Sequence, residues 1–131
     1  MLTFAIPKGR MLEQTLECLT DIGIDTPSAD ELDRQLVFYD GQERFKFVVV
    51  KPYDVTTYVE YGAADVGVSG KDIIEETEAN IYEPVDLGFS RCRLSVARPE
   101  EPVAGSERKT PRVATEFTNI SERYFAQKGQ N

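Results

Sequence analysis

The first 23 residues predict a strand, a short glycine turn and an amphipathic helix. Residues 2–6 form an apolar run that is typical of a buried strand, and the Lys8-Gly9-Arg10 turn follows shortly afterwards. Three leucines then recur on one face of a helix over about residues 11–22: Leu12, Leu16 and Leu19. Gly23 is a natural end for that helix. A strand, turn and helix in this order make the first half of a βαβ unit, so we expect an α/β fold.

The middle of the chain predicts a β-hairpin, two further helices and a brief strand. Residues 35–39 and 44–50 are strand-like, and Asp40-Gly41 between them is a strong hairpin signal. A short helix ending at Gly62, a strand over residues 65–68 and a third helix follow. We interpret the acidic residues of that third helix as a solvent-exposed face: Glu75, Glu76 and Glu78.

The last 41 residues predict two more strands and a final helix. Residues 91–98 alternate polar and apolar side chains as a half-buried strand does, and residues 112–115 predict another strand. Residues 99–111 between them are typical of a loop, and Thr118 or Asn119 can cap a helix that continues through Lys128. An α/β pattern would next supply a strand, so we expect the N-terminal part of a longer protein.

Histidine is absent from the 131 residues, which narrows the available chemistry. Its absence excludes the commonest general base, a Ser-His-Asp triad and most zinc sites. The net charge of −8 argues against sequence-independent binding of nucleic acid. It does not argue against small phosphorylated ligands, because these respond to local charge and to oriented backbone N–H groups.

The sequence lacks the signs of a membrane or secreted protein. The longest apolar run covers residues 47–50, far short of the roughly 20 residues that span a bilayer. The N-terminus has no basic region of the kind that opens a signal peptide. We interpret Cys18 and Cys92 as small buried hydrophobic residues rather than as a disulfide. We therefore expect a soluble, cytoplasmic chain.

The Lys8-Gly9-Arg10 turn is the first candidate for binding phosphate. The N-terminus of the following helix attracts anions, and glycine lets a ligand approach the backbone closely. The two cations would add charge-assisted hydrogen bonds. The alternative is an ordinary turn with solvated basic residues.

A second candidate lies between Gly62 and Asp72, where glycines surround a short buried strand. Ser69 and Gly70 would present free N–H groups at the end of that strand, where open α/β sheets bind ligands. The spacing matches neither a P-loop nor a dinucleotide fingerprint. The alternative is close packing of the strand on a helix.

Lys51 and Arg34 are the third candidates. Lys51 follows a predicted strand directly, and Arg34 precedes another strand and can reach the same edge. For each residue taken alone, a solvated surface position is the simpler interpretation.

Taken in order, these segments and several others resemble the catalytic subunit of ATP phosphoribosyltransferase. The matches cover nearly the whole chain: Ala5–Arg10, Val50–Val55 with Tyr58-Val59, Gly62–Asp72, Leu87–Phe89, Cys92–Leu94, Arg112–Thr115 and the helix at Asn119. The Lys-Gly-Arg form of the first turn resembles the short-form enzymes, which work with a regulatory subunit related to histidyl-tRNA synthetase. The resemblance thus implies a homo-oligomer that also assembles with such a subunit.

The resemblance implies the fold of the type II periplasmic binding proteins, with two α/β lobes and a cleft between them. Residues 1–90 would form most of the first lobe and residues 91–131 the start of the second. The family reaction joins N1 of the ATP adenine to C1 of phosphoribosyl pyrophosphate, and it opens histidine biosynthesis. It releases pyrophosphate, with Mg²⁺ present on the substrate phosphates.

The resemblance also implies roles for individual residues. Arg34 would stabilise the departing pyrophosphate, and Arg93 would lie at the junction of the lobes. The remaining predicted residues would bind the substrates: Lys8, Gly9, Arg10, Lys51, Ser69, Gly70, Lys71 and Asp72.

Two departures from the family pattern limit these roles. Glu116 stands where the family usually has a basic residue. The main phosphoribosyl-pyrophosphate loop of the family lies downstream of Asn131, so we expect the chain by itself to lack transferase activity. The alternative function is a non-enzymatic binder of nucleotides or anions with the same fold.

Overall fold

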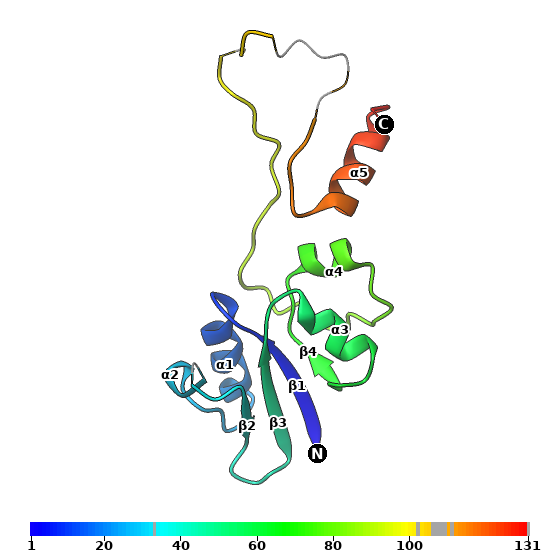
Figure 1. Ribbon diagram of the computed structural model, residues 1–131. Helices are drawn as coiled ribbons and strands as arrows, with labels where there is room; N and C mark the ends of the chain where they lie inside the picture. The colour runs from blue at the N-terminus through cyan, green and yellow to red at the C-terminus, as the bar shows by residue number, and fades with distance from the viewer. Residues whose placement is uncertain (33, 102, 106–109, 111, 131) are drawn as a thin grey trace. The chain divides into compact units, whose positions relative to one another are not determined.

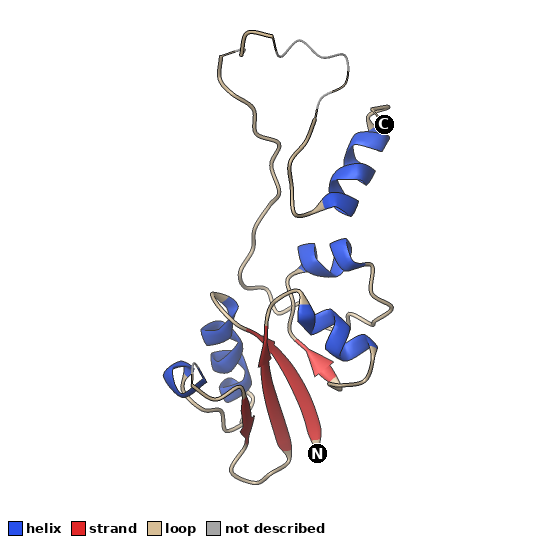
Figure 2. Ribbon diagram, in the orientation of Figure 1, coloured by secondary structure: helices blue, strands red, loops and turns tan. Residues whose placement is uncertain are grey.

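The computed structural model describes residues 1–32, 34–101, 103–105, 110 and 112–130 (Figure 1). The chain divides into two compact units, Met1–Ser90 and Arg91–Asn131. Within the described residues it forms one four-stranded sheet and five helices, which confirms the α/β prediction (Figure 2). No helix in this described part is both long and apolar enough to cross a membrane.

The sheet belongs to the first unit and has the strand order β2-β3-β1-β4. Strand β1 runs parallel to both β3 and β4, whereas β2 pairs antiparallel with β3. The strands are β1 (Leu2–Pro7), β2 (Val37–Tyr39), β3 (Phe45–Val50) and β4 (Val66–Gly67). The helices are α1 (Met11–Asp21), α2 (Ala29–Leu32), α3 (Asp54–Glu60), α4 (Lys71–Thr77) and α5 (Thr118–Gln127).

Helix α1 begins and ends where the sequence predicts. Its buried face carries Leu12, Leu16 and Leu19, and Gly23 adopts φ +83° just after its end. The Gly23 N–H donates to the Thr20 carbonyl at 2.9 Å and the Ile24 N–H donates to the Leu19 carbonyl at 3.0 Å. This left-handed glycine cap satisfies carbonyl groups that the helix itself leaves unpaired.

The two faces of the sheet carry separate hydrophobic clusters. Successive strand residues point to opposite faces, so Ala5 and Ile6 of β1 belong to different clusters. One face packs against α1 and α2, with Phe47 at its centre. The other face packs against α3 through Val55. The parallel strands are therefore covered on both sides, as parallel sheets require.

The predicted β2–β3 hairpin is confirmed, and its turn is longer than the Asp40-Gly41 pair. The Asp40 carboxylate is buried and accepts the Phe45 N–H at 2.8 Å and the Arg44 Nε at 3.4 Å. Burial favours a higher pKa for Asp40, but hydrogen bonds from Phe45 and Arg44, together with the Arg44 charge, hold its pKa below the ordinary value. Asp40 thus closes the turn with its side chain as an internal acceptor.

Two strand predictions in the second unit are wrong. Residues 91–98 and 112–115 form neither helix nor strand, and all of these side chains are exposed. A half-buried strand needs a surface to cover its apolar face, yet none of the described residues from 91 to 130 is buried. Cys92 is likewise exposed rather than buried, whereas Cys18 is half-buried, and both are free thiols.

Helix α5 confirms the last predicted helix, with one change at its start. Its N-cap residue is Phe117, not Thr118 or Asn119. The Phe117 N–H donates to Thr115 Oγ1 at 3.0 Å, so a threonine before the helix organises the turn into it.

Candidate functional site

The carboxyl ends of the parallel strands bring several predicted residues to one edge of the sheet. Pro7 of β1 pairs with Val50 of β3, so Lys8 and Lys51 follow neighbouring strand ends. The Lys8 N–H donates to the Val50 carbonyl at 2.8 Å, which joins the two ends directly. On the other side of β1, the Val68 N–H donates to the Ala5 carbonyl at 3.1 Å and carries the chain on to Ser69.

Arg34 lies toward the same edge of the sheet, because it precedes a strand that runs antiparallel to β3. Strand β2 is antiparallel to β3, so the residues before β2 lie near the residues that follow β3. Val37 pairs with Val48, and the Val49 N–H donates to the Leu36 carbonyl at 2.9 Å. The prediction that Arg34 lies toward the Lys51 end of the hairpin agrees with this register.

We call Lys8, Arg10, Arg34 and Lys51 the cationic edge. All four residues are exposed. Across the strand order, the edge runs past the ends of three strands, β2, β3 and β1, or about 10 Å at a spacing of about 4.8 Å between strands. An extended polyphosphate or nucleotide is comparable in length, and open α/β sheets bind ligands at this end of their strands.

Gly9 makes the turn at this edge possible. It adopts φ +101°, a conformation that favours glycine, and the space where a side chain would begin holds no other atom within 4 Å. The turn is exposed and leads into α1 after Arg10, as predicted. A ligand can therefore approach the Gly9 backbone and the start of α1.

The glycine of β4 serves packing rather than ligand binding. A Cβ atom on Gly67 would lie 2.7 Å from Val55 Cγ1 and 2.8 Å from Val59 Cγ2, both on α3. Real Cβ atoms do not approach so closely, so the helix and strand meet only because residue 67 has no side chain. The sequence left two interpretations of the glycines between Gly62 and Asp72, ligand binding and close packing of the strand on a helix. Close packing holds at Gly67.

Replacing Gly67 with alanine should lower the free energy of unfolding by about 1–3 kcal/mol, because the added methyl group forces α3 away from β4. Urea unfolding followed by circular dichroism measures this change. Gly41→Ala is the matched control, since its new Cβ would meet only the end of the Asp25 side chain, at 3.2 Å. Equal stability of Gly67→Ala and Gly41→Ala would contradict the packing argument.

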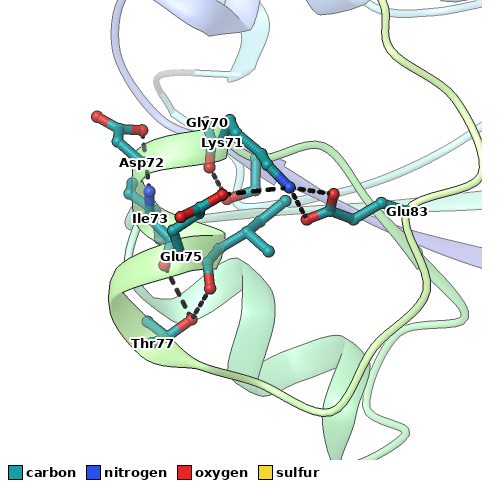
Figure 3. A network of polar contacts seen from close by, with 9 residues as sticks. Gly70, Lys71, Asp72, Ile73, Glu75, Thr77 and Glu83 are labelled. Atoms are coloured by element: carbon teal, nitrogen blue, oxygen red, sulfur yellow. Dashed lines mark hydrogen bonds and ion pairs between the residues drawn. The ribbon is translucent and has the colours of Figure 1, made fainter. Parts of the chain in front are cut away.

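Lys71 is held by carboxylates in the structure (Figure 3). Its ammonium group donates to both Glu83 carboxylate oxygens, at 2.9 and 2.5 Å, and lies 3.6 Å from Glu75 Oε1. The hydrogen bonds to Glu83, followed by the charges of Glu83 and Glu75, raise the pKa of Lys71 above its ordinary value. A phosphate ligand would have to compete with Glu83 for this cation.

The other residues around the start of α4 are engaged locally. Asp72 Oδ1 accepts the Ile73 N–H at 2.9 Å (Figure 3). Ser69 Oγ donates to the Gly70 carbonyl at 3.4 Å. A Cβ atom on Gly70 would lie 2.3 Å from Asp72 Oδ1, so the Asp72 carboxylate rests against the glycine. Asp72 thus organises the first turn of α4.

One prediction about α4 is wrong. Glu76 is buried, with 6% of its surface exposed, whereas the sequence suggested a solvent-exposed acidic face. It shares the buried side of α4 with Ile73. Residues three apart lie on the same helix face, so Glu76 faces the same side of α4 as the buried Ile73.

Comparison with known proteins identifies the family. A family model described as HisG, ATP phosphoribosyltransferase, matches residues 51–131. The chain belongs to the ATP phosphoribosyltransferase family. A relative named ATP phosphoribosyltransferase from Syntrophotalea carbinolica is 46% identical over 98% of the chain. Another of that name, from Bacillus licheniformis, is 43% identical over 98% of the chain.

A solved structure gives the same family. It is titled as the ATP phosphoribosyl transferase (HisG:HisZ) complex from Thermotoga maritima, with a TM-score of 0.67 and 26% sequence identity. That match covers 99% of this chain and 60% of the solved chain. The chain likewise spans 60% of the length of the two relatives named above.

In this ATP phosphoribosyltransferase family member, Arg93 is the one predicted site residue of the second unit. It belongs to the unit Arg91–Asn131 and is exposed, in a segment without helix or strand. Its role at a junction of lobes stays a prediction, as do the substrate contacts predicted for the cationic edge.

Sequence reasoning missed the carboxylates that hold Lys71. Glu75 follows Lys71 by four residues, and that spacing on a predicted helix is a recognised signal for an ion pair. Glu83 lies twelve residues away, outside any helix or strand, where spacing predicts no contact. Only the path of the chain after α4 reveals the Glu83–Lys71 pair in this family member.

Proposed function

We propose that the chain provides substrate-binding and catalytic residues of an ATP phosphoribosyltransferase. The enzyme would condense ATP with phosphoribosyl pyrophosphate to give phosphoribosyl-ATP and pyrophosphate, the first step of histidine biosynthesis. The observation that best supports this proposal is the cationic edge, where four exposed arginine and lysine residues follow or precede neighbouring strands in a member of this family. The shared name of the relatives favours the enzyme over a non-enzymatic binder.

The proposed chemistry suits a site without histidine. The reaction needs two polyphosphates held in register and stabilisation of the charge on the departing pyrophosphate, with little proton transfer. We assign phosphate contacts to Lys8, Gly9 and Arg10, and stabilisation of the leaving group to Arg34. Lys51 and Asp72 would help to hold the nucleotide, with Ser69, Gly70 and Lys71 beside them.

Magnesium would enter this site with the substrates. Among the described residues, no group of three cysteine, aspartate or glutamate side chains is placed to hold a metal ion. We assign Mg²⁺ to the substrate phosphates, because phosphate oxygens are strong ligands for it. Its chemistry would be to neutralise charge as pyrophosphate leaves.

The same proposal extends to fold, assembly and location. The two units of the chain, residues 1–90 and 91–131, would be most of the first lobe and the start of the second lobe of a fold like the type II periplasmic binding proteins. The solved relative is titled as a complex of HisG with HisZ, which supports an assembly with a regulatory subunit. We propose a homo-oligomer within that assembly, acting in the cytoplasm.

Arg10→Gln should raise the Kd for ATP about 10-fold or more, because it removes a charged partner of the phosphates. Isothermal titration calorimetry of ATP into the 131-residue chain measures this loss. Lys46→Gln is the control, since it removes one positive charge near the start of β3, at the end of the strand away from the cationic edge. Equal weakening by both substitutions, or no ATP binding by the unaltered chain, would count against the proposed site.

A further inference from the structure

Lys71 has two carboxylate partners of different kinds. Glu75 lies one turn further along α4, as a local helix pair, at 3.6 Å. Glu83 comes from the segment after α4 and contacts the ammonium through both of its oxygens. The side chain of Lys71 is 65% exposed and that of Glu83 is 36% exposed, so water and ions reach the pair.

The segment that carries Glu83 is fixed near its ends. The Asn80 N–H donates to Glu60 Oε1 at 2.9 Å, which ties the start of the segment to α3. Ser90 Oγ hydrogen-bonds to the Gln14 side chain on α1. Between these points Tyr82 is 97% exposed and Val85 is 70% exposed, so apolar packing contributes little around Glu83.

We propose that Glu83 competes with ligand phosphate for Lys71 and so weakens phosphate binding at this end of the sheet. This inference rests on the proposed function, since it takes Lys71 as part of the substrate-binding edge. Lys71 follows Gly70 directly, and the chain reaches Gly70 from β4, the neighbour of β1 at that edge. Glu83 keeps Lys71 neutralised until a ligand with more negative charge replaces the carboxylate.

The consequence is weaker binding of every phosphate ligand that needs Lys71. Exposed ion pairs contribute at most about 1 kcal/mol, so a ligand can displace Glu83 without unfolding anything. A polyphosphate presents several negative charges to the edge at once, whereas inorganic phosphate presents at most two near neutral pH. Both ligands must break the same ion pair, and the repulsion between the Glu83 carboxylate and the ligand rises with ligand charge, so Glu83 weakens the binding of the polyphosphate at least as much as that of inorganic phosphate.

Glu83→Gln tests this competition. Calorimetric titrations of the full chain with inorganic phosphate and with inorganic tripolyphosphate give the two affinities. We expect Glu83→Gln to tighten phosphate binding about two- to fivefold and tripolyphosphate binding by at least as much, because both ligands are freed from the same competing carboxylate. The matched control is Glu17→Gln, which removes the same charge from an exposed position on α1.

The double variant Lys71→Met/Glu83→Gln separates competition from a general charge effect. Without the Lys71 ammonium, replacing Glu83 should change the phosphate affinity no more than Glu17→Gln does. Urea unfolding of each variant shows that the fold is retained. Equal shifts for Glu83→Gln and Glu17→Gln, or a gain that persists without Lys71, would overturn the competition.

The same titrations distinguish this inference from the proposed function. Loss of tripolyphosphate binding in Arg10→Gln, with Glu83→Gln behaving like Glu17→Gln, would overturn the role of Glu83 and retain the cationic edge. Failure of the unaltered chain to bind either tripolyphosphate or ATP would overturn both.

Discussion

Replacing Phe47 with alanine should lower the free energy of unfolding by about 3–5 kcal/mol. Phe47 has 0% of its surface exposed and occupies the centre of the cluster between the sheet and α1. Its ring lies 5.5 Å from that of Phe4 on the adjacent strand. Truncation removes this contact and leaves a cavity in a core that parallel strands cannot easily close, because backbone pairing fixes their separation.

Chemical unfolding in urea, followed by circular dichroism, measures the Phe47→Ala effect. Tyr39→Ala is the control, because Tyr39 is an aromatic residue in the same hairpin with 53% of its surface exposed. We expect the control to change the unfolding free energy by less than about 1 kcal/mol. Similar losses for the two variants would mean that the cluster around Phe47 does not dominate the stability of the sheet.

Arg34→Ala should slow turnover about 10²- to 10³-fold, the usual effect of removing one group that stabilises developing negative charge. The rate is best measured in a chimera that joins residues 1–131 to the remaining 40% of the Syntrophotalea carbinolica relative, of which this chain covers 60%. Release of pyrophosphate from ATP and phosphoribosyl pyrophosphate reports the reaction. A role in the transition state predicts a fall in kcat with KM little changed.

Two comparisons make the Arg34 experiment decisive. Lys46→Ala removes another cationic side chain, near the start of β3, and should leave the turnover of the chimera within a few-fold of the parent. Parent-like turnover by Arg34→Ala would remove Arg34 from the mechanism. A folded chimera that binds ATP and releases no pyrophosphate would favour the non-enzymatic binder.

The parts of the fold that the sequence predicts are those determined by neighbours along the chain. The leucines of α1, the glycine that ends it and the polar pair in the hairpin act within a few residues, so their patterns survive without tertiary information. The same holds for the cationic edge, since the ends of parallel strands meet at one side of a sheet. The position of Arg34 toward this edge follows from the predicted hairpin, because β2 runs antiparallel to β3.

The errors arise where the outcome depends on a distant surface. The alternation over residues 91–98 indicates a face that is suited to burial, but burial also requires something to cover that face. The run of acidic residues around Glu76 indicates an exposed surface, but Glu76 lies with Ile73 on the buried side of α4. The Lys71–Glu83 pair depends on how the chain returns after α4, which no local spacing encodes.

The antiparallel hairpin also provides an attachment site away from the cationic edge. Its turn, around Gln42, is exposed and connects the ends of β2 and β3 that are opposite to Arg34 and Lys51. A fluorophore or a surface linker attached at Gln42 would therefore leave the cationic edge open to solution. Immobilised or labelled in this way, the protein would report ligand capture without obstruction by its own attachment point.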